Sequence, residues 1–314
     1  MSTHPLETVA HTTAMEYRRR ICLAMNFICE NLGRELTLEE VARSASFSMF
    51  HFHRIFKTVV GETVADFTRR VRLELAANKL LLNSCTPITD IAFECGFSSS
   101  QNFAKAFRLY FGLTPSVYRK SKNCHIFSKG ENAVSLRASY IQDDVSMNFV
   151  KSATQGGLKM QAEVREMPEY HVAYVRKMGP YGKEVCEQAF AELMQWAGPE
   201  GHLTSGQILS IYWDNPEITP AEKCRTDACI SVAKNTATRG QIGLQTIGGG
   251  PYVVCRFEIT GEDFHQAWEE AFIWLVNGGY ECADSPCYEL YHNNAEEHPE
   301  GKWIFDICIP LKRK

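Results

Sequence analysis

Residues 46–61, SFSMFHFHRIFKTVVG, have the period of a helix and carry side chains of different chemistry on two faces. On a wheel of about 100° per residue, one face collects the apolar side chains that we expect in a core: Phe52, Ile55, Phe56 and Val59. The opposite face collects Phe50, His53, Arg54 and Lys57. One face therefore packs, and the other offers aromatic and basic groups to a partner outside the domain.

The outward face suits the major groove of DNA. Arg54 can pair bidentately with guanine, and His53 can donate or accept a hydrogen bond at a base edge. Phe50 can contact a thymine methyl group, and Lys57 can reach a phosphate. The alternative is an exposed phenylalanine beside ordinary solvated charges. The surrounding helix signals and a second copy of the pattern favour DNA binding.

The residues before the quoted stretch predict a helix-turn-helix. A first amphipathic helix covers residues 15–31, and Thr37 then begins a short helix with Glu40 completing a capping box. After a tight turn, Ser48 is a natural N-cap for the helix of the quoted stretch, and Gly61 ends that helix. A short helix, a tight turn and a second helix form this motif.

A second copy of the motif follows about 50 residues later. Phe52, Phe56, Gly61 and Thr63 recur 51 positions on as Phe103, Phe107, Gly112 and Thr114. Ala42 and Phe47 recur 50 positions on as Ala92 and Phe97, so the copies differ by one residue in the turn region. Thr86 is the expected cap of the copy's first helix, with Pro87 at its first position, and Gly96 suits a left-handed turn.

The second helix of this copy also has two faces. Its expected core stripe is Phe103, Ala106, Phe107 and Tyr110, and its outward side chains are Gln101, Ala104, Lys105 and Arg108. Glutamine can read adenine, and lysine can read guanine. One long helix over residues 63–83 joins the copies and would fix the two reading helices relative to each other. The two helices could then enter successive major-groove segments about 34 Å apart without dimerisation.

Residues 15–120 resemble the DNA-binding domain of AraC/XylS transcriptional regulators, in particular the compact Rob, MarA and SoxS type. The motifs LTLEEVARSASFSMFHFHRIFK, ITDIAFECGFSSSQNFAKAFR and YFGLTPSVYRK carry this resemblance. It implies base or phosphate contacts at Phe50, His53, Arg54, Ser100, Gln101 and Lys105. It also implies double-stranded DNA and RNA polymerase as partners. The net charge of the N-terminal part agrees with DNA binding, because residues 1–125 contain 16 Lys/Arg and 11 Asp/Glu. Residues 126–314 contain 17 Lys/Arg and 26 Asp/Glu and are net acidic.

The second part of the chain contains an internal repeat. Residues 123–157 show no sustained period and are expected to be a linker between domains at 1–122 and 158–314. Residues 171–231 align with residues 250–310 at a constant offset of 79. Each copy has the pattern strand, helix, strand, strand. We therefore expect an all-α N-terminal domain with two helix-turn-helix motifs, followed by an α+β domain of two pseudo-symmetric βαββ repeats.

The two repeats differ where Glu289 replaces Ser210. On a strand, Cys287, Glu289 and Tyr291 share one face, so the carboxylate lies beside a phenol. If that face lines a cleft, a lipophilic cation would favour the charged carboxylate, and Tyr291, Trp213 and Trp268 could add cation–π attraction of about 0.5 to 2 kcal/mol each. The alternative places Glu289 on a solvated strand face and the aromatic residues in the core.

Residues 160–314 resemble the GyrI-like effector-binding domain, through the motifs YVRKMGPYG, LSIYWDNPE and CYELYHNN. The resemblance implies that Glu289 faces a pocket for a small, hydrophobic, cationic effector. The sequence as a whole thus predicts a ligand-sensing transcriptional regulator, an activator by analogy with the family, and no enzyme. Two alternatives stay open. One is a GyrI-like small-molecule hydrolase fused to a DNA-binding domain, with Glu289 as general base, and the other is a protein-interaction module.

Composition sets the remaining expectations. No apolar run approaches the roughly 20 residues that span a bilayer, and the first 20 residues lack a secretion-signal pattern, so we expect a cytoplasmic protein without membrane contact. The 12 cysteines include no CxxC pair and are expected to be reduced, with Cys22, Cys229, Cys255 and Cys308 in apolar patterns. No zinc signature is present, and we expect neither a metal nor a cofactor.

Overall fold

The computed structural model describes residues 5–82, 86–122, 157–283 and 285–313. The chain forms two compact units. The first unit combines Met1–Ser116 with Glu169–Gly248, and the second combines Val117–Pro168 with Gly249–Lys314. The first repeat of the α+β region therefore belongs to the same unit as the N-terminal helices. Of the expected linker at 123–157, all but Gly157 lies outside the described residues.

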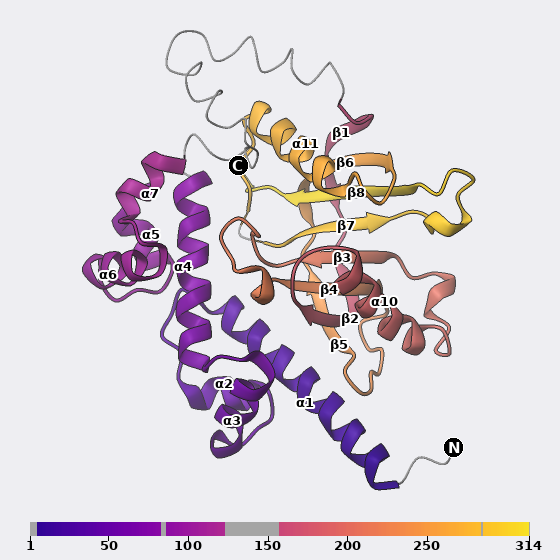
Figure 1. Cartoon of the computed structure of the whole chain (residues 1–314), viewed down its shortest axis with the longest axis horizontal. Helices are drawn as coiled ribbons and strands as arrows, with labels where there is room; N and C mark the ends of the chain where they lie inside the picture. The colour runs from indigo at the N-terminus through magenta and orange to yellow at the C-terminus, as the bar shows by residue number, and fades with distance from the viewer. Residues whose placement is uncertain (1–4, 83–85, 123–156, 284, 314) are drawn as a thin grey trace. The chain divides into compact units, whose positions relative to one another are not determined.

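The N-terminal region is all-helical, as predicted (Figure 1). Its helices are α1 (Pro5–Glu30), α2 (Leu38–Ser44), α3 (Met49–Val60), α4 (Val64–Leu82), α5 (Ile88–Glu94), α6 (Ser100–Phe111) and α7 (Pro115–Lys122). The pairs α2–α3 and α5–α6 are the two helix-turn-helix motifs, and α4 is the connecting helix. The predicted difference of one residue in the turn is confirmed, because α2 and α5 begin 50 residues apart and α3 and α6 begin 51 apart.

Most of the predicted helix ends are confirmed. Thr37 and Glu40 form the capping box at the start of α2, and Gly61 ends α3 in a left-handed conformation. Ser48 is the N-cap residue of α3, but its side chain makes no cap bond, and its Oγ lies 3.1 Å from Nδ1 of His51. Two boundaries differ from prediction. The helix α1 begins ten residues earlier than expected, at Pro5, and the N-cap of α5 is Pro87, where Thr86 was expected.

Two residues expected in the core are exposed. The side chains of Val59 and Tyr110 are 39% and 38% accessible. The buried side chains of each of these helices are instead spaced by four residues: Phe52, Phe56 and Val60 in α3, and Phe103 and Phe107 in α6, followed by the half-buried Phe111. Ile55 of α3 is half-buried against the same core. Phe52 and Phe56 contact edge to face, with ring centroids 5.6 Å apart, and anchor the first motif.

Each unit contains a four-stranded antiparallel arrangement with one long helix. In the first unit the elements are β2 (Tyr170–Met178), α10 (Lys183–Ala197), β3 (Ile208–Tyr212), β4 (Arg225–Ser231) and β5 (Gly243–Ile247), with strand order β3-β4-β2-β5. In the second they are β1 (Met160–Met167), β6 (Gly250–Ile259), α11 (Phe264–Asn277), β7 (Cys287–Tyr291) and β8 (Trp303–Pro310), with order β1-β6-β8-β7. The predicted pair of βαββ repeats is confirmed.

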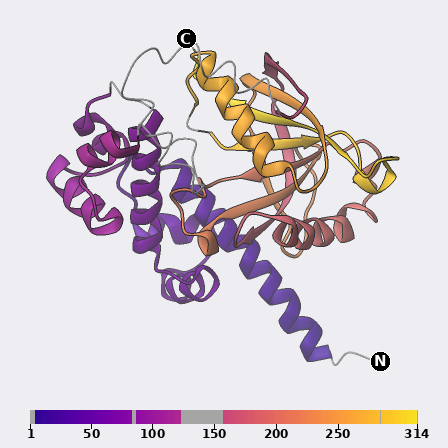
Figure 2. The same ribbon diagram turned by 45° about the horizontal axis from the view of Figure 1, so that its top comes forward.

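The helix of each repeat covers one face of its own strands (Figure 2). Ala189 and Leu193 of α10 pack on Ala173 and Ala228 of the first repeat. In the second repeat, Ala267, Ala271 and Leu275 of α11 lie in a core with Phe257 and Phe305. Small residues on the inner face of each helix let its backbone approach the sheet closely.

The sequence did not predict β1 and β5, the two strands at the edges. Each of them precedes one repeat along the chain and pairs with the other repeat. The strand β1 pairs with β6, and β5 pairs with β2. The two repeats therefore exchange their edge strands.

The register of the first strands corrects the predicted alignment. Arg176 lies opposite Asp227 on β4, and Arg256 lies opposite Asp306 on β8. Equivalent residues of β2 and β6 are thus 80 positions apart, whereas those of β3 and β4 are 79 positions from those of β7 and β8. A slip of one residue reverses the face to which every side chain of a strand points. The constant offset of 79 was therefore wrong for the first strand.

Candidate DNA and ligand sites

The outward face of α3 presents the side chains that the sequence assigned to DNA. His53, Arg54 and Lys57 are exposed, while Phe52 and Phe56 are completely buried beneath them. The side chain of Phe50 lies outside the described part of the chain. The helix is thus held by its core stripe, with its basic face open to solvent.

The helix α6 presents an equivalent face. Gln101, Lys105 and Arg108 are exposed, and Ser100 is half-buried at the first position of the helix. The Oγ of Ser99 accepts a hydrogen bond from the backbone N–H of Asn102 at 3.2 Å, which caps the helix start. The start of α6 is therefore capped beside its outward polar residues, whereas α3 begins without a side-chain cap bond.

The arginines of the connecting helix α4 have different roles from those on the reading helices. Arg70 is buried and forms ion pairs with Glu62 and Glu74, and Arg72 donates hydrogen bonds to the carbonyl oxygens of Leu32 and Arg34. These guanidinium groups hold the helices together. By contrast, Arg54, Lys57, Lys105 and Arg108 form no ion pair with another described residue. These four side chains on α3 and α6 are therefore available to phosphate or bases.

A buried carboxylate lies in the second repeat. Glu289 on β7 is 1% accessible and accepts a hydrogen bond from the indole N–H of Trp268 on α11 at 2.7 Å. The hydroxyl group of Tyr291 also donates to this carboxylate. The predicted shared face is confirmed, because Cys287 and Tyr291 pack with Trp268 against the α11 core. The alternative of a solvated Glu289 is excluded.

Aromatic rings surround this carboxylate group. The ring of Trp268 stacks on Phe272, and the ring of Tyr291 contacts Trp303 and Phe305, with centroid distances of 5.4 to 6.0 Å. A carboxylate in such apolar surroundings is costly unless hydrogen bonds or a cation compensate its charge. Two neutral donors on aromatic side chains provide part of this compensation and leave ring faces that can attract a cation.

The contacts of Trp213 are with Asp227, Arg176 and Arg225 of the first unit. Its indole N–H donates to Asp227 at 2.8 Å, and the guanidinium groups of Arg176 and Arg225 lie 4.9 and 5.7 Å from the centre of its rings. The structure thus joins Trp268 and Tyr291 to Glu289, whereas the described contacts of Trp213 are with other residues. The cation–π interactions of Trp213 are made with the chain's own arginines.

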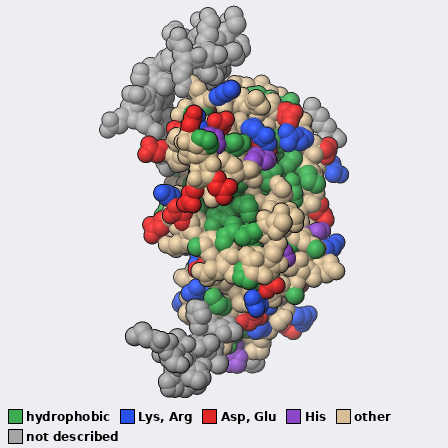
Figure 3. Space-filling model, turned by 90° about the vertical axis from the view of Figure 1, so that its right-hand side faces the viewer, with side chains coloured by type: hydrophobic (Ala, Val, Ile, Leu, Met, Phe, Trp, Pro, Cys, Tyr) green, Lys and Arg blue, Asp and Glu red, His purple; other side chains and the backbone are tan. Residues whose placement is uncertain are grey.

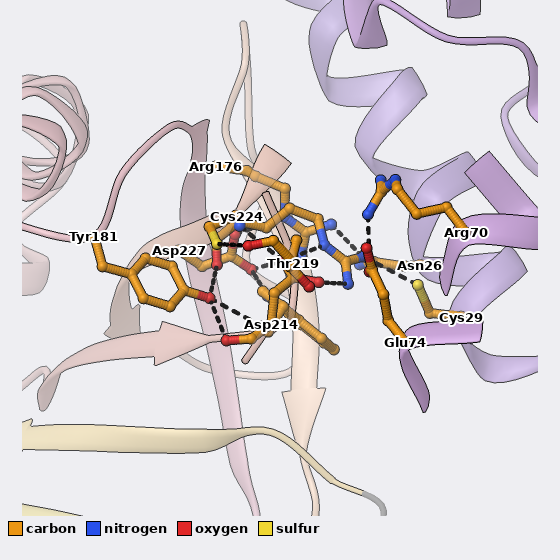
Figure 4. Close-up of polar contacts among 12 residues, drawn as sticks. Asn26, Cys29, Arg70, Glu74, Arg176, Tyr181, Asp214, Thr219, Cys224 and Asp227 are labelled. Carbon is orange, nitrogen blue, oxygen red and sulfur yellow. Dashed lines mark hydrogen bonds and ion pairs between the residues drawn. The ribbon is translucent and has the colours of Figure 1, made fainter. Parts of the chain in front are cut away.

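A buried network of charges in the first unit was not predicted (Figure 4). Arg225 at the start of β4 is 2% accessible and binds Asp214 through two nitrogens, at 2.7 and 2.9 Å. The same guanidinium donates to Sγ of Cys29 in α1 at 3.0 Å. Neither the charge pattern nor the strand pattern identifies this network, because Arg225 follows a loop and Cys29 is 196 residues away in the sequence.

Burial and neighbouring charges act in opposite directions in this network. Burial lowers the pKa of the Arg225 guanidinium, but the adjacent Asp214 carboxylate outweighs burial, so the net shift is upward. Burial also raises the pKa of Glu74 on α4, and the nearby Arg70 guanidinium only partly reverses this shift. Arg225 therefore remains a cation inside the unit, and it depends on Asp214 for compensation.

Ten cysteines are described and all are free thiols, with Cys229, Cys255 and Cys308 buried and Cys22 half-buried. Burial raises the pKa of Cys255 to about 12. Within the described ranges, no group of three or more His, Cys, Asp or Glu side chains could hold a metal ion. No described helix is long and apolar enough to cross a membrane.

Apolar and charged side chains lie in different areas of one face of the molecule. Hydrophobic side chains gather in a central patch, with acidic and basic side chains around it (Figure 3).

Paired helix-turn-helix motifs with free basic faces, joined to a duplicated α+β region that buries a carboxylate among aromatic rings, define a DNA-binding protein with a ligand-binding domain. The chain belongs to the GyrI-like family and carries an AraC-type helix-turn-helix domain. A family model described as a GyrI-like small molecule binding domain matches residues 160–312, and one described as a helix-turn-helix domain matches residues 41–121. The combination is that of a transcriptional regulator.

Several curated relatives match the second part of the chain. The DNA gyrase inhibitor of Salmonella typhimurium strain LT2 is 33% identical over 160 residues, which are 49% of this chain and 100% of that protein. The DNA gyrase inhibitor of Citrobacter koseri is 32% identical over 159 residues, again 49% of this chain and 100% of that protein.

The solved structures similar to this chain include two that match different parts of it. The C-terminal domain of AraT from Geobacillus stearothermophilus is 29% identical and covers 32% of this chain and 84% of its own, with a TM-score of 0.31. The C-terminal domain of EcmrR is 18% identical and covers 49% of this chain and 99% of its own, with a TM-score of 0.41.

Proposed function

We propose that this transcriptional regulator reads a bipartite DNA site with α3 and α6 and senses a small hydrophobic cation at Glu289. The observation that carries the proposal is the hydrogen-bonded Glu289 carboxylate among aromatic rings, in a domain of a small-molecule-binding family. We place the DNA-binding domain at 1–122, the linker at 123–157 and the effector domain at 158–314. The site of action is the cytoplasm, where bacterial DNA is accessible.

The DNA-reading residues follow from exposure and charge. His53, Arg54 and Lys57 on α3 would contact one major-groove segment, and Gln101, Lys105 and Arg108 on α6 would contact the next. Ser100 and Phe50 complete the set of proposed contacts at the starts of the two helices. The partner is double-stranded DNA, and regulation is by activation through contact with RNA polymerase.

The effector chemistry follows from the surroundings of Glu289. A flat cation could place its charge near the carboxylate and its apolar part against the rings of Trp268 and Tyr291. A ligand changes the regulator's output only if it binds two states of the protein with different affinity. Glu289 acts in this proposal as a binding group. Turnover of a reactive ester that Glu289→Gln abolishes would support the hydrolase alternative instead.

A second candidate function is inhibition of DNA gyrase. It is favoured by the 33% identity to a DNA gyrase inhibitor over that protein's full length. The test is a supercoiling assay with purified gyrase and the full-length chain. Loss of supercoiling at stoichiometric protein, on plasmids without the regulator's own site, would support this candidate.

The experiment that tests the regulator is a selection from genomic DNA. Full-length protein is incubated with sheared genomic fragments near physiological salt, with and without lipophilic cations, and the bound fragments are sequenced. We expect a motif with two half-sites about one helical turn apart. Uniform recovery that disappears as salt rises would show phosphate binding without base reading and would overturn the proposal.

A further inference from the structure

The two repeats share one turn after their third element. In the first repeat, Oδ2 of Asp214 accepts the backbone N–H of Arg225 at 2.8 Å. In the second repeat, Oδ1 of Asn293 accepts the backbone N–H of Ile304 at 2.7 Å. These residues occupy equivalent positions, so the turn itself has the same architecture in both copies.

The side chains on this shared turn differ in chemistry. Arg225 occupies the position of the apolar Ile304, and its guanidinium group turns back to Asp214 and reaches Sγ of Cys29 on α1. Asp214 occupies the position of Asn293, which is neutral. The first repeat therefore has a buried ion pair where the second repeat has none at the same positions.

Other residues of the same segment contact the connecting helix α4 and the residues before it. Nδ2 of Asn215 donates to Oδ1 of Asn78 at 2.9 Å, and Nζ of Lys223 donates to Glu62 at 3.0 Å. The side chain of Thr219 is hydrogen-bonded to Glu74. Figure 4 shows Thr219 and Asp214 facing Glu74 and Arg70.

The equivalent residues of the second repeat make local contacts. Asn294, which corresponds to Asn215, caps a turn by accepting the N–H of Glu296 at 3.2 Å. Lys302, which corresponds to Lys223, pairs with Glu258 and Glu300 of its own repeat. Asn215 makes the same local bond, because its Oδ1 accepts the N–H of Glu217 at 2.9 Å. The asparagine and the lysine are therefore common to both repeats, and only the first repeat places them against the helical region. The changed identities are Asp214, Thr219 and Arg225.

The network continues from α4 to a reading helix. Glu74 accepts a hydrogen bond from the hydroxyl group of Tyr110 on α6 at 2.8 Å and also pairs with Arg70. The reading residues Arg54 and Lys105 remain exposed in this arrangement. The first repeat therefore contacts the helix that joins the two reading motifs and does not cover their basic faces.

We propose that the two repeats have divided their roles: segment 214–225 of the first repeat is a docking surface for α1 and α4, and the second repeat retains the ligand site. The partner of this surface is the chain's own DNA-binding region. By holding α4, the first repeat sets the spacing and orientation of α3 and α6. The effect on DNA affinity rests on the proposed function, but the docking itself does not.

The buried charges of this surface contribute more to the specificity of the docked arrangement than to its stability. A buried ion pair gains little net stability, because desolvation offsets most of the attraction between its charges. It does, however, make misplaced arrangements costly, since a buried charge without its partner is strongly unfavourable. A surface built on Arg225, Asp214 and Glu74 is therefore suited to a single relative position of α4.

Symmetry-related substitutions test the proposal on the full-length protein. Lys223→Glu places a carboxylate against Glu62, whereas Lys302→Glu makes the same change at the equivalent position of the second repeat. Native-state hydrogen exchange of the α4 amides reports on docking without DNA. We expect exchange at residues 70–78 to be at least about 10-fold faster in Lys223→Glu and unchanged in Lys302→Glu. Unchanged exchange in Lys223→Glu would overturn the docking surface.

A second measurement uses Asn78 and Asn215, which are partly exposed and neutral, so that both variants should fold. Asn78→Ala and Asn215→Ala should each accelerate α4 exchange, and the double variant should exchange no faster than the faster single variant. Additive effects would show that the two residues act independently and would contradict docking through this contact.

DNA binding then separates the two proposals. On the selected DNA site, Lys223→Glu should weaken affinity about 10-fold and reduce discrimination against a site with two base pairs inserted between its halves. Lys302→Glu should bind within about twofold of the parent. If α4 exchange responds as expected but no specific DNA is ever recovered, the docking surface stands and the regulator proposal fails.

Discussion

Ser46 and Gly96 occupy equivalent positions in the turns of the two helix-turn-helix motifs, and both are in the left-handed backbone region, with φ of 55° and 77°. The second motif has the residue that this conformation favours. The first has a serine, whose Cβ makes the same conformation less favourable by about 1 to 2 kcal/mol. Ser46 is the one non-glycine residue with positive φ in the described part of the chain.

This pair gives a prediction about stability. A Cβ at Gly96 would lie 2.0 Å from the carbonyl oxygen of Leu32, so Gly96→Ala should destabilise the first unit by about 2 kcal/mol or more. Ser46→Gly should be neutral or stabilise by up to about 1 kcal/mol, because relief of strain is partly offset by greater freedom of the unfolded chain. Urea denaturation of both variants measures this difference. Equal losses of stability in both would contradict it.

DNA recognition by α3 is tested at Arg54. If Arg54 reads a base, Arg54→Ala should cost about 1 to 3 kcal/mol on the selected site and relax preference at one base pair. Arg239→Ala removes an exposed arginine from a loop far from α3 in the sequence and should leave affinity unchanged. Binding titrations on the selected site and on its single-base variants measure both effects. Equal loss of affinity on all DNA sequences would show that Arg54 contacts a phosphate and does not read a base.

Ligand binding is tested at Glu289. Glu289→Gln keeps the shape of the side chain and removes its charge, so binding of an aromatic quaternary ammonium ion should weaken about 10-fold, or about 1.4 kcal/mol. A neutral compound of the same shape should lose much less. Glu258→Gln, at an exposed glutamate of β6, is the matched control. Calorimetric titration measures all three. Unchanged cation affinity in Glu289→Gln would show that this carboxylate does not contribute to ligand binding.

The stability of the second unit should depend on Asp306. Burial raises the pKa of this carboxyl group, but hydrogen bonds with His292 and Arg256 outweigh burial and lower the pKa from 3.8 to about 2. Because the folded pKa is the lower one, ionised Asp306 stabilises the fold above pH 3.8. This contribution is lost as pH falls towards 2.

Asp306→Asn should therefore lower the free energy of unfolding by about 1 to 2 kcal/mol at pH 7, with allowance for solvent screening at the exposed Arg256 partner. The difference between variant and parent should decrease below about pH 4. Denaturant unfolding at pH 7, 5 and 3 measures it. A difference that stays constant over this range would mean that packing, and not charge, accounts for the loss.

Local signals in the sequence predicted the helices well because their ends are decided by neighbouring residues. The capping box of Thr37 and Glu40 and the terminal Gly61 act within one turn of the chain. The core stripe was less predictable. Both reading helices pack at a spacing of four residues, so Val60 is buried where Val59 was expected, and Tyr110 turns its hydroxyl group towards Glu74. Packing against the rest of the domain decides which of two adjacent residues is buried.

Long-range contacts could not be predicted in the same way. The edge strands β1 and β5 are recognisable only through their partners, and Val164 in β1 is exposed. At the proposed ligand site, alternation along one strand correctly placed Tyr291 beside Glu289, and the difference between the repeats identified Glu289 as a candidate. The pairing of Arg225 with Cys29 joins residues 196 positions apart and has no signature in a single sequence.

The exchanged edge strands also bear on how this region could have originated. Because β1 pairs with β6 and β5 pairs with β2, the pattern is the one expected of a domain-swapped dimer of single repeats whose two chains later fused. Cutting the chain at Gly249 would not recover an ancestral half. The first piece would keep β1 without its partner, and the second would expose the edge of β6. The continuous segment 169–248 already contains β5 together with β2, its partner. The other half would need β1 moved to follow β8 by circular permutation, so that β1 stays in one piece with β6.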